Sequence, residues 1–370
     1  MTESILIVTE DEKLLDDLLR LCAAAGAEAE VAHGIPPGPG AWESAPLVLV
    51  GDDRAGPLLR SARSPARRAG VLLVGRDPDD PGVWRRGMGI GAEHVVLLPD
   101  GESWLTGRIA DAAEGVGRQA LTVGVMGGRG GAGASTLACA LAVTAARAGH
   151  RTVLVDGDPL GGGLDILLGG ERAEGLRWPA FAESRGRVGG MALEESLPRL
   201  HGLRVLSWDR GDSTVVPPEA VRAVLGAARR LGGVVVVDLP RRLDEAVAEA
   251  LTQLDLGLLV VPTELRAVAA AQRVASRAGM VLRDLRVVVR GPAGSGPGGL
   301  DGTEIAGLLG LRLAGAVPTE GGLSAAVDGG RPPGADARGP LARFCAEFWA
   351  RALPENGGAP PVGGLGSVAV

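Results

Sequence analysis

The 370-residue sequence contains no tyrosine and a single lysine, Lys13, so arginine supplies the remainder of its 38 basic residues. Its three cysteines, Cys22, Cys139 and Cys345, are far apart and outside any Cys-x-x-Cys spacing, which indicates neither a disulfide framework nor a zinc site. No apolar run reaches the roughly 18 residues that a membrane-spanning helix needs, and the N-terminal segment lacks the pattern of a signal peptide. We therefore expect a cytoplasmic protein.

Positive charge is not in excess either. The formal net charge is −6, which does not provide the broad basic surface that non-specific nucleic-acid binding requires. A local arginine patch is left as an alternative, but the composition gives no strong signal of nucleic-acid binding. The length exceeds that of one typical domain, so we expect two.

Residues 1–115 are expected to form the first domain. Short apolar runs alternate with turns rich in Gly, Pro and Asp, and residues 12–25 form an amphipathic helical segment, which is typical of a parallel α/β sheet. The strand-like runs are residues 4–9, 28–32, 47–50, 71–74 and 94–98. This pattern resembles a response-regulator receiver, so the sequence predicts a degenerate, CheY-like domain.

A receiver needs an acidic pair after its first strand, an aspartate ending the third strand and a lysine ending the fifth. Glu10 and Asp11 supply the acidic pair, but Gly51 stands where the acceptor aspartate is expected and Leu98 where the lysine is expected. The two aspartates that follow Gly51 come one or two positions late. We therefore predict an interaction domain that lacks the phosphoacceptor site, with phosphotransfer as the less favoured alternative.

Residues 120–354 are expected to form a second α/β domain with a larger parallel sheet. Helical connectors separate its predicted strands, which are residues 121–126, 152–156, 203–206, 234–238, 257–261, 286–289 and 314–317. Residues 355–370 consist mostly of Pro, Gly, Ala and Val without periodicity, and we predict a disordered tail there.

A glycine-rich segment joins the first strand of this domain to a helix. Residues 127–136 read Gly-Gly-Arg-Gly-Gly-Ala-Gly-Ala-Ser-Thr, and the helix continues to about residue 148. Glycines let successive backbone N–H groups turn toward phosphate oxygens, the helix N-terminus adds positive potential, and a Ser or Thr hydroxyl can bind Mg²⁺. The segment predicts a phosphate-binding loop, and the alternative is a glycine-rich turn without a ligand.

The loop resembles the deviant Walker A motif of the MinD/ParA ATPases, Lys-Gly-Gly-x-Gly-Lys-Ser/Thr-Ser/Thr. Arg129 stands at the signature lysine and Ala134 at the phosphate-binding lysine. The resemblance implies a parallel-sheet P-loop NTPase domain with ATP and Mg²⁺ as cofactors. Its implied nucleotide-binding residues in the loop are Gly128, Arg129, Gly130, Gly131, Ala132, Gly133, Ala134, Ser135 and Thr136.

The alanine at position 134 bears on hydrolysis. A methyl group cannot neutralise phosphate charge, and Lys13 lies in the other domain. Losing a preorganised contact to transition-state charge commonly slows a reaction by about a hundred- to a thousandfold. We expect nucleotide binding to persist on backbone amides and Mg²⁺, with weak or absent hydrolysis.

Two strand-ending aspartates support the nucleotide interpretation. Residues 152–159 resemble the family's second-strand motif, whose later aspartate lies near the attacking water, which implies a catalytic Asp158. Residues 234–240 resemble a Walker B strand, in which four valines bring Asp238 to the edge of the sheet where ligands bind. The resemblance implies Mg²⁺ ligation by Ser135, Asp158 and Asp238. Taken alone, each aspartate could equally be an ordinary turn residue.

Base recognition is less well defined. Residues 260–264 resemble the family segment that follows the next strand, which implies a nucleotide contact at Pro262. The family often has an asparagine for adenine near the end of the following strand, whereas this sequence has Val289 and Arg290. Base specificity is therefore left open.

The order of a receiver-like domain and a lysine-less P-loop domain resembles the CpaE/TadZ branch of this family, and in particular the actinobacterial septum site-determining Ssd proteins. The resemblance implies a cytoplasmic spatial regulator recruited to the septum or pole, acting in septum-site determination and cell division inhibition or in localising pilus and secretion machinery. Implied partners are a division-site protein or a secretion or pilus ATPase. An active ATPase that cycles between dimer and monomer is the alternative.

The family also implies a homodimer that sandwiches nucleotide, in which Arg129 would reach the phosphates of the partner subunit. Near the C-terminus, residues 341–351 form an amphipathic helix with Leu341, Phe344, Phe348 and Trp349 on its apolar face. Packing of this face on the P-loop domain is favoured over membrane contact, because the helix is short and has only two cations.

Overall fold

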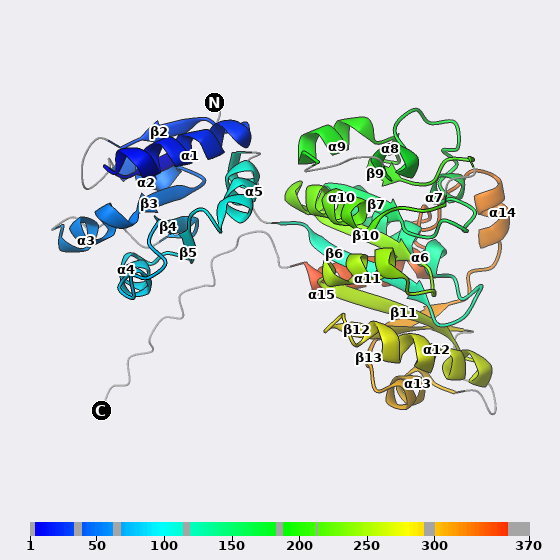
Figure 1. The fold of residues 1–370 in the computed structure, drawn as a ribbon. Helices are drawn as coiled ribbons and strands as arrows, with labels where there is room; N and C mark the ends of the chain where they lie inside the picture. The colour runs from blue at the N-terminus through cyan, green and yellow to red at the C-terminus, as the bar shows by residue number, and fades with distance from the viewer. Residues whose placement is uncertain are drawn as a thin grey trace, which may run out of the picture. The chain divides into compact units, whose positions relative to one another are not determined.

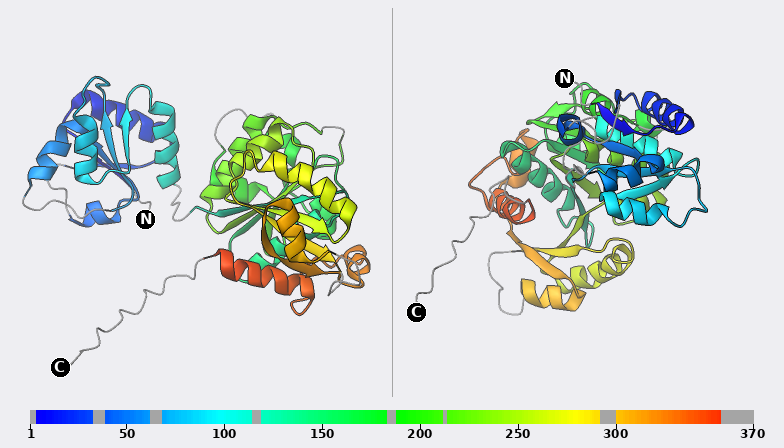
Figure 2. Two further views of the ribbon diagram at one scale, coloured as in Figure 1. Left: turned by 90° about the horizontal axis from the view of Figure 1, so that it is seen from below. Right: turned by 90° about the vertical axis from the view of Figure 1, so that its left-hand side faces the viewer.

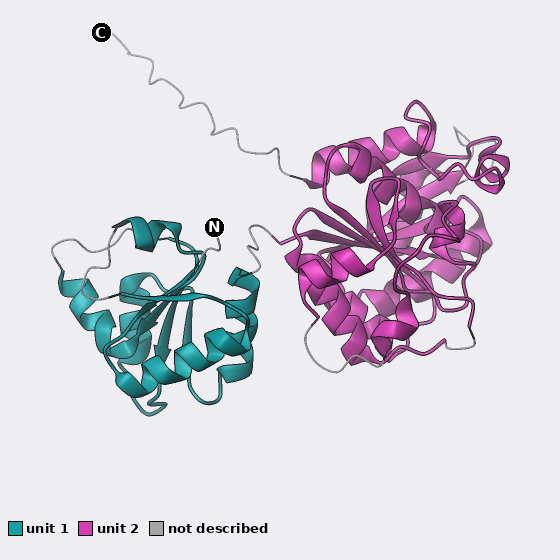
Figure 3. Ribbon diagram, turned by 90° about the horizontal axis from the view of Figure 1, so that it is seen from above, with its two compact units in different colours: residues 1–118 teal, residues 119–370 magenta. Residues whose placement is uncertain are grey.

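The computed structural model describes residues 4–32, 39–61, 68–113, 119–182, 188–211, 214–291 and 300–353. The chain divides into two compact units, residues 1–118 and 119–370 (Figure 3). The tail predicted to be disordered, residues 355–370, lies outside the described residues.

Unit 1 alternates strands and helices along the chain (Figure 1). Its strands pair in parallel in the order β2-β1-β3-β4-β5. The elements are β1 Ile5–Val8, α1 Glu12–Ala24, β2 Ala29–Val31, α2 Pro39–Ser44, β3 Val48–Gly51, α3 Asp52–Arg60, β4 Val71–Gly75, α4 Val83–Ile90, β5 His94–Leu97 and α5 Glu102–Ala113.

The central strands of unit 1 are buried because helices cover both faces of the sheet. Helices α1 and α5 pack on one face and α2, α3 and α4 on the other. Asp11 caps α1 by accepting hydrogen bonds from the backbone N–H groups of Lys13 and Leu14. Leu14, Leu18, Leu21 and Cys22 of α1 are buried against the sheet at helical spacing, whereas Lys13 is exposed.

Unit 2 contains a larger sheet with helical crossovers. Its elements are β6 Leu121–Gly127, α6 Ala134–Arg147, β7 Thr152–Asp156, α7 Leu164–Leu167, α8 Trp178–Ala182, α9 Gly190–Ser196, β8 Arg199–Leu200, β9 Leu203–Leu206, α10 Pro218–Arg230, β10 Val234–Leu239, α11 Glu245–Thr252, β11 Leu256–Pro262, α12 Leu265–Ala278, β12 Leu285–Gly291, α13 Gly302–Leu309, β13 Arg312–Pro318, α14 Leu323–Asp328 and α15 Pro340–Ala352.

The sheet of unit 2 has the order β13-β12-β11-β6-β10-β7-β9-β8. All pairs are parallel except β8 with β9, so the predicted parallel α/β sheet is confirmed with one short antiparallel strand added at its edge. Strand β6 lies between β10 and β11. The carboxyl ends of β6, β10 and β7 therefore come together at one edge, where ligands bind in sheets of this kind.

Two helical layers enclose this sheet, with α10 and α12 on one face and α6 and α15 on the other (Figure 2). Phe344, Phe348 and Trp349 of α15 are buried, and the Trp349 Nε1–H donates a hydrogen bond to the Leu141 carbonyl of α6 at 2.9 Å. The structure therefore shows the packed alternative for the apolar face of this helix. Among the described residues, no helix is long and apolar enough to span a membrane.

Candidate functional site: the loop between β6 and α6

The loop from residue 128 to residue 133 connects the central strand β6 to α6. Gly131 and Gly133 have φ angles of 69° and 93°, a left-handed conformation that glycine adopts at low cost. The first N–H groups of a helix have no intrahelical acceptor, and they add positive potential at the end of the loop. The local geometry is thus that of an anion-binding loop.

A cavity of about 430 Å³ opens over this loop. Most of the predicted nucleotide-binding residues line it, since the loop contributes residues 129 to 136. From the neighbouring strand ends and helices come Asp158, Leu167, Asp238, Leu239, Pro240, Arg241 and Arg290.

Ala134 is the first residue of α6 and is half-buried in the wall of this cavity. Its methyl group is the only side-chain atom at the position where the resemblance implies a cation. The lysine of unit 1 is the only one in the sequence, so any positive side chain in the cavity must be an arginine.

Asp238 ends the buried core of β10 and is 3% exposed. It is hydrogen bonded to the Ser135 side chain. Burial, together with the nearby carboxylates of Asp156 and Asp158, raises the pKa of Asp238 to about 7. The structure thus brings two of the three predicted Mg²⁺ ligands, Ser135 and Asp238, together, and the third, Asp158, lies on the wall of the same cavity.

Asp156, two residues before Asp158, was not singled out from the sequence. It is 1% exposed and accepts hydrogen bonds from Ser207 Oγ at 2.9 Å and from the Leu164 N–H at 2.9 Å. Its carboxylate also accepts from the Asp158 N–H at 3.2 Å, so it fixes the turn that presents Asp158. Burial raises the pKa of Asp156 to about 6 despite these donors.

Two predicted contact residues lie outside the cavity lining. Gly128 is buried, and a Cβ there would come within 2.6 Å of the Ala271 Cβ of α12, so this glycine permits close packing of the loop on α12. Pro262 is buried at the end of β11, where it pairs with Arg290. Gly128 thus supports the loop from behind, whereas Pro262 lies level with Arg290 on the neighbouring strand.

Three arginines line the cavity, and the sequence singled out only Arg129 as a ligand-binding residue. Arg129 forms an ion pair with Glu264 at 3.0 Å. Arg241 follows β10 and is exposed. Arg290, at the end of β12, donates from Nη1 to the Ala132 carbonyl of the loop at 3.1 Å.

The aspartates that follow Gly51, near the position where a receiver would carry its phosphoacceptor, are engaged in internal contacts. Asp52 accepts two hydrogen bonds from Arg86, at 2.5 and 2.7 Å. Asp53 accepts from the Thr9 hydroxyl at 2.7 Å and from the Glu10 N–H at 2.8 Å. Leu98 is buried and brings no cation to the site.

Comparison with known proteins places the chain in a family. Residues 8–120 match the sequence profile described as the Rv3660c-like, CheY-like N-terminal domain. The uncharacterized protein Rv3660c of Mycobacterium tuberculosis strain H37Rv is 41% identical over 307 residues, which span 82% of this chain and 85% of that protein. The protein MT3760 of strain CDC 1551 matches with the same values. This chain belongs to the Rv3660c-like family.

Solved structures show the fold of the remainder. A ParA family ATPase from Chlorobium tepidum TLS superposes with a TM-score of 0.57 at 16% identity, over 64% of this chain and 99% of that one. The MinD cell division protein of Aquifex aeolicus gives 0.52 at 20% identity, over 63% and 96%. MinD of Pyrococcus horikoshii OT3, solved with Mg-ADP, gives 0.50 at 14% identity, over 63% and 96%. This Rv3660c-like chain therefore combines a CheY-like domain with a MinD/ParA-type P-loop domain, which confirms the predicted fold class.

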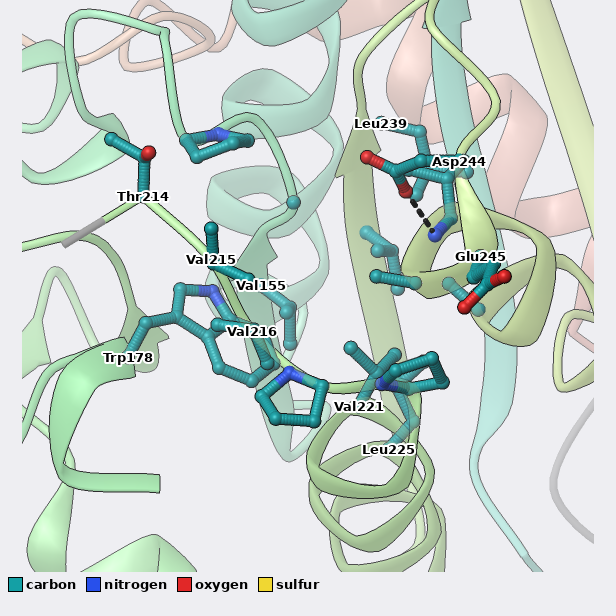
Figure 4. A pocket seen from close by; sticks show the side chains of 18 of the residues that line it. Val155, Trp178, Thr214, Val215, Val216, Val221, Leu225, Leu239, Asp244 and Glu245 are labelled. Carbon is teal, nitrogen blue, oxygen red and sulfur yellow. Dashed lines mark hydrogen bonds between the residues drawn. The ribbon is translucent and has the colours of Figure 1, made fainter. Parts of the chain in front are cut away.

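A second cavity of this Rv3660c-like chain, about 340 Å³ in volume, lies between β7, β10, α10 and α11 (Figure 4). Trp178, Val216 and Val221 contribute to a mostly apolar wall, and the carboxylates of Asp244 and Glu245 lie across the cavity from Trp178. An apolar wall with two acidic groups is unsuited to phosphate. We therefore assign phosphate chemistry to the loop cavity rather than to this one.

Proposed function

We propose that this chain binds ATP with Mg²⁺ in the loop cavity and works as a nucleotide-dependent spatial regulator whose own hydrolysis is weak or absent. The observation that carries the proposal is a phosphate loop with its Ser135–Asp238 contact intact and with Ala134 where a cation is required for fast turnover. The MinD protein solved with Mg-ADP has the same fold, which supports the choice of ligand.

The donor set fits Mg²⁺. This ion prefers oxygen ligands and keeps waters or phosphate oxygens in part of its octahedral shell. Within the described residues, no group of three or more His, Cys, Asp or Glu side chains is arranged to hold a metal ion without help. The Ser135 hydroxyl and Asp238 would therefore hold Mg²⁺ only together with nucleotide phosphates, and the ion would offset phosphate charge there.

The other residues of the site have distinct roles in this proposal. Residues 130 to 136 bind phosphate through backbone N–H groups, and Asp158 orients the attacking water. Gly128 packs the loop on α12 and Pro262 lies level with Arg290, and neither residue touches the ligand. The absence of a cation at position 134 removes stabilisation mainly from the transition state for phosphoryl transfer. Nucleotide binding is therefore retained while hydrolysis is slow.

We infer that the regulated process belongs to the CpaE/TadZ and Ssd kind, namely septum-site determination or the positioning of pilus or secretion machinery. The domain order and the missing lysine support this choice. In this proposal two chains form a nucleotide-stabilised homodimer recruited to the septum or pole, where a division-site protein or a secretion ATPase is the partner.

A true ATPase cycle is the second candidate function. The arginines in the cavity wall and the placement of Asp158 favour it, because a guanidinium can stabilise transferring phosphate. The two candidates differ in their dependence on Asp158. A cycling enzyme loses its localisation pattern in the Asp158→Ala variant, whereas a nucleotide-stabilised scaffold keeps it.

The deciding experiment measures Mg-ATP binding by calorimetry and phosphate release on the same purified sample. The unaltered chain is compared with Ala134→Lys and with Ala134→Gln, which adds a side chain of similar length without charge. We expect tight binding with negligible turnover in the unaltered chain, and at least a tenfold faster turnover only in the lysine variant. Turnover at ordinary enzyme rates in the unaltered chain would contradict the proposal, as would the absence of binding.

A further inference from the structure

The side chain of Arg290 contacts the loop and also lines the loop cavity. It is the penultimate residue of β12, paired with Pro262 of β11 and Val317 of β13, so its backbone is held between two neighbouring strands. Its half-buried side chain donates to the Ala132 carbonyl at 3.1 Å. A Cβ on Gly133 would lie 2.7 Å from its Nη1, so the guanidinium sits directly against the loop.

The charge of Arg290 is not neutralised by the described part of the chain. Arg129, in contrast, pairs with the Glu264 carboxylate at 3.0 Å. Within the described residues, Arg290 forms no ion pair with a carboxylate, although it lines the cavity that holds the loop N–H groups. A guanidinium has five N–H donors, and one hydrogen bond to Ala132 leaves others for an anion.

A second cavity that Arg290 lines is too small for a nucleotide base. That cavity, lined by Gly133, Val288, Pro318 and Glu320 among others, has a volume of about 30 Å³. Such a volume holds roughly two water molecules. The ligand group within reach of Arg290 is therefore an anion in the larger loop cavity rather than an aromatic ring.

We propose that Arg290 supplies from β12 the phosphate-binding cation that Ala134 cannot supply from α6. This inference rests on the proposed nucleotide function and adds to it a specific contact and a ligand class. The ligands are nucleoside di- and triphosphates, recognised mainly by the charge of the phosphate chain and only weakly by the base. One edge of the guanidinium stays on Ala132, and the other binds phosphate oxygen as a charge-assisted hydrogen bond.

The test measures the Kd of Mg-ADP, Mg-GDP and AMP by calorimetry on the full chain. Arg290→Gln removes the charge while keeping a donor for the Ala132 carbonyl, and Arg290→Lys keeps the charge. Arg286→Ala is the matched control, because Arg286 lies on the same strand and pairs with Asp284 away from the loop. Thermal unfolding of each variant verifies that the fold is retained.

We expect Arg290→Gln to weaken Mg-ADP and Mg-GDP binding by about tenfold or more, with a smaller effect on AMP, which has less phosphate charge. Arg290→Lys should recover part of the loss, and adding Ala134→Lys to Arg290→Gln should restore most of it. Arg286→Ala should bind like the unaltered chain. ADP and GDP should differ by less than about fivefold.

Three results would overturn the inference, and they are distinguishable. If the unaltered chain binds Mg-ADP and a folded Arg290→Gln variant binds within twofold of it, Arg290 is not the phosphate cation, while the proposed function stands. If the unaltered chain binds no nucleotide, the proposed function fails and this inference fails with it. A loss in Arg290→Gln that Ala134→Lys does not relieve would assign Arg290 to loop support alone.

Discussion

The guanidinium of Arg129 lies 3.0 Å from the carboxylate of Glu264 in the same chain. Its Nη1 also donates to the Gly130 carbonyl at 2.8 Å, so the side chain is folded across its own loop. In the dimer proposed above, Arg129 would have to leave Glu264 before it could reach the phosphates of a second subunit.

Removing this internal contact should favour the dimer. The pair is partly exposed, and such pairs contribute up to about 1 kcal/mol, equivalent to roughly a fivefold shift in an equilibrium. We expect Glu264→Gln to raise the nucleotide-dependent association constant two- to fivefold in sedimentation velocity experiments. Glu249→Gln breaks another surface pair, with Arg222, and is the control. Unchanged association in Glu264→Gln, or full association in Arg129→Ala, would contradict this role.

The two buried aspartates predict an unusual pH dependence of stability. The pKa of Asp238 is raised to about 7 and that of Asp156 to about 6, both mainly by burial, from the ordinary aspartate value of 3.8. The folded chain then binds protons more tightly than the unfolded chain, so the free energy of unfolding falls as pH rises from about 4 to about 7.

Neutralising Asp238 should remove much of that slope. We expect Asp238→Asn to stabilise the ligand-free chain by about 1 to 3 kcal/mol at pH 8 while changing it little at pH 5. Urea unfolding at the two pH values provides the measurement, with the exposed Asp328→Asn as the control. Mg-nucleotide should reverse the trend, because the metal requires the ionised carboxylate. Equal stabilisation at both pH values would show that packing, and not ionisation, is responsible.

The C-terminal helix should be necessary for the stability of unit 2. Trp349 is 4% exposed and hydrogen bonded to Leu141 of α6, so truncating it leaves a cavity and removes this hydrogen bond. We expect Trp349→Ala to lower the free energy of unfolding by about 3 to 5 kcal/mol. The exposed Arg343→Ala on the same helix should change it by less than about 0.5 kcal/mol. Similar values for both variants would mean that α15 is not docked in solution.

Unit 1 should not accept a phosphoryl group. The carboxylates of Asp52 and Asp53 are both engaged, and a Cβ at Gly51 would overlap Asp53 and the Thr9 side chain. Incubation with acetyl phosphate and Mg²⁺ should therefore add no phosphate, as measured by intact-mass spectrometry. Stoichiometric labelling that disappears in Asp53→Ala would show that Asp53 can leave its present partners. Gly51→Asp should lower the free energy of unfolding of unit 1 by about 1 to 3 kcal/mol rather than create a phosphoacceptor site.

Much of the fold follows from local sequence. Strands such as Val234–Leu239 are buried on both faces, so their apolar runs are continuous and their positions were predicted to within one or two residues. The two-residue strand β8 was missed, because two residues carry no periodicity and its pairing with β9 depends on the turn at His201 and Gly202. Helices α7 to α9 also lack a long apolar repeat.

The site was less predictable than the fold. The loop glycines, Ser135 and Asp238 belong to short motifs that can be recognised in the local sequence. Arg290, in contrast, is 158 residues from the carbonyl that it contacts. Its place at the loop depends on the register of β12 against β11, which brings Arg290 level with Pro262. Asp156 was missed for a similar reason, since its donors come from Ser207 and Leu164.

Lys13 stands exposed on α1 of unit 1, and unit 2 contains no primary amine on any side chain. Amine-directed reagents would therefore label the chain at this residue and at the N-terminus only. A dye or cross-linker coupled there reports on unit 1 without modifying any side chain of the loop cavity. For the same reason, lysine acylation of this chain can modify unit 1 but cannot modify any side chain of the loop cavity.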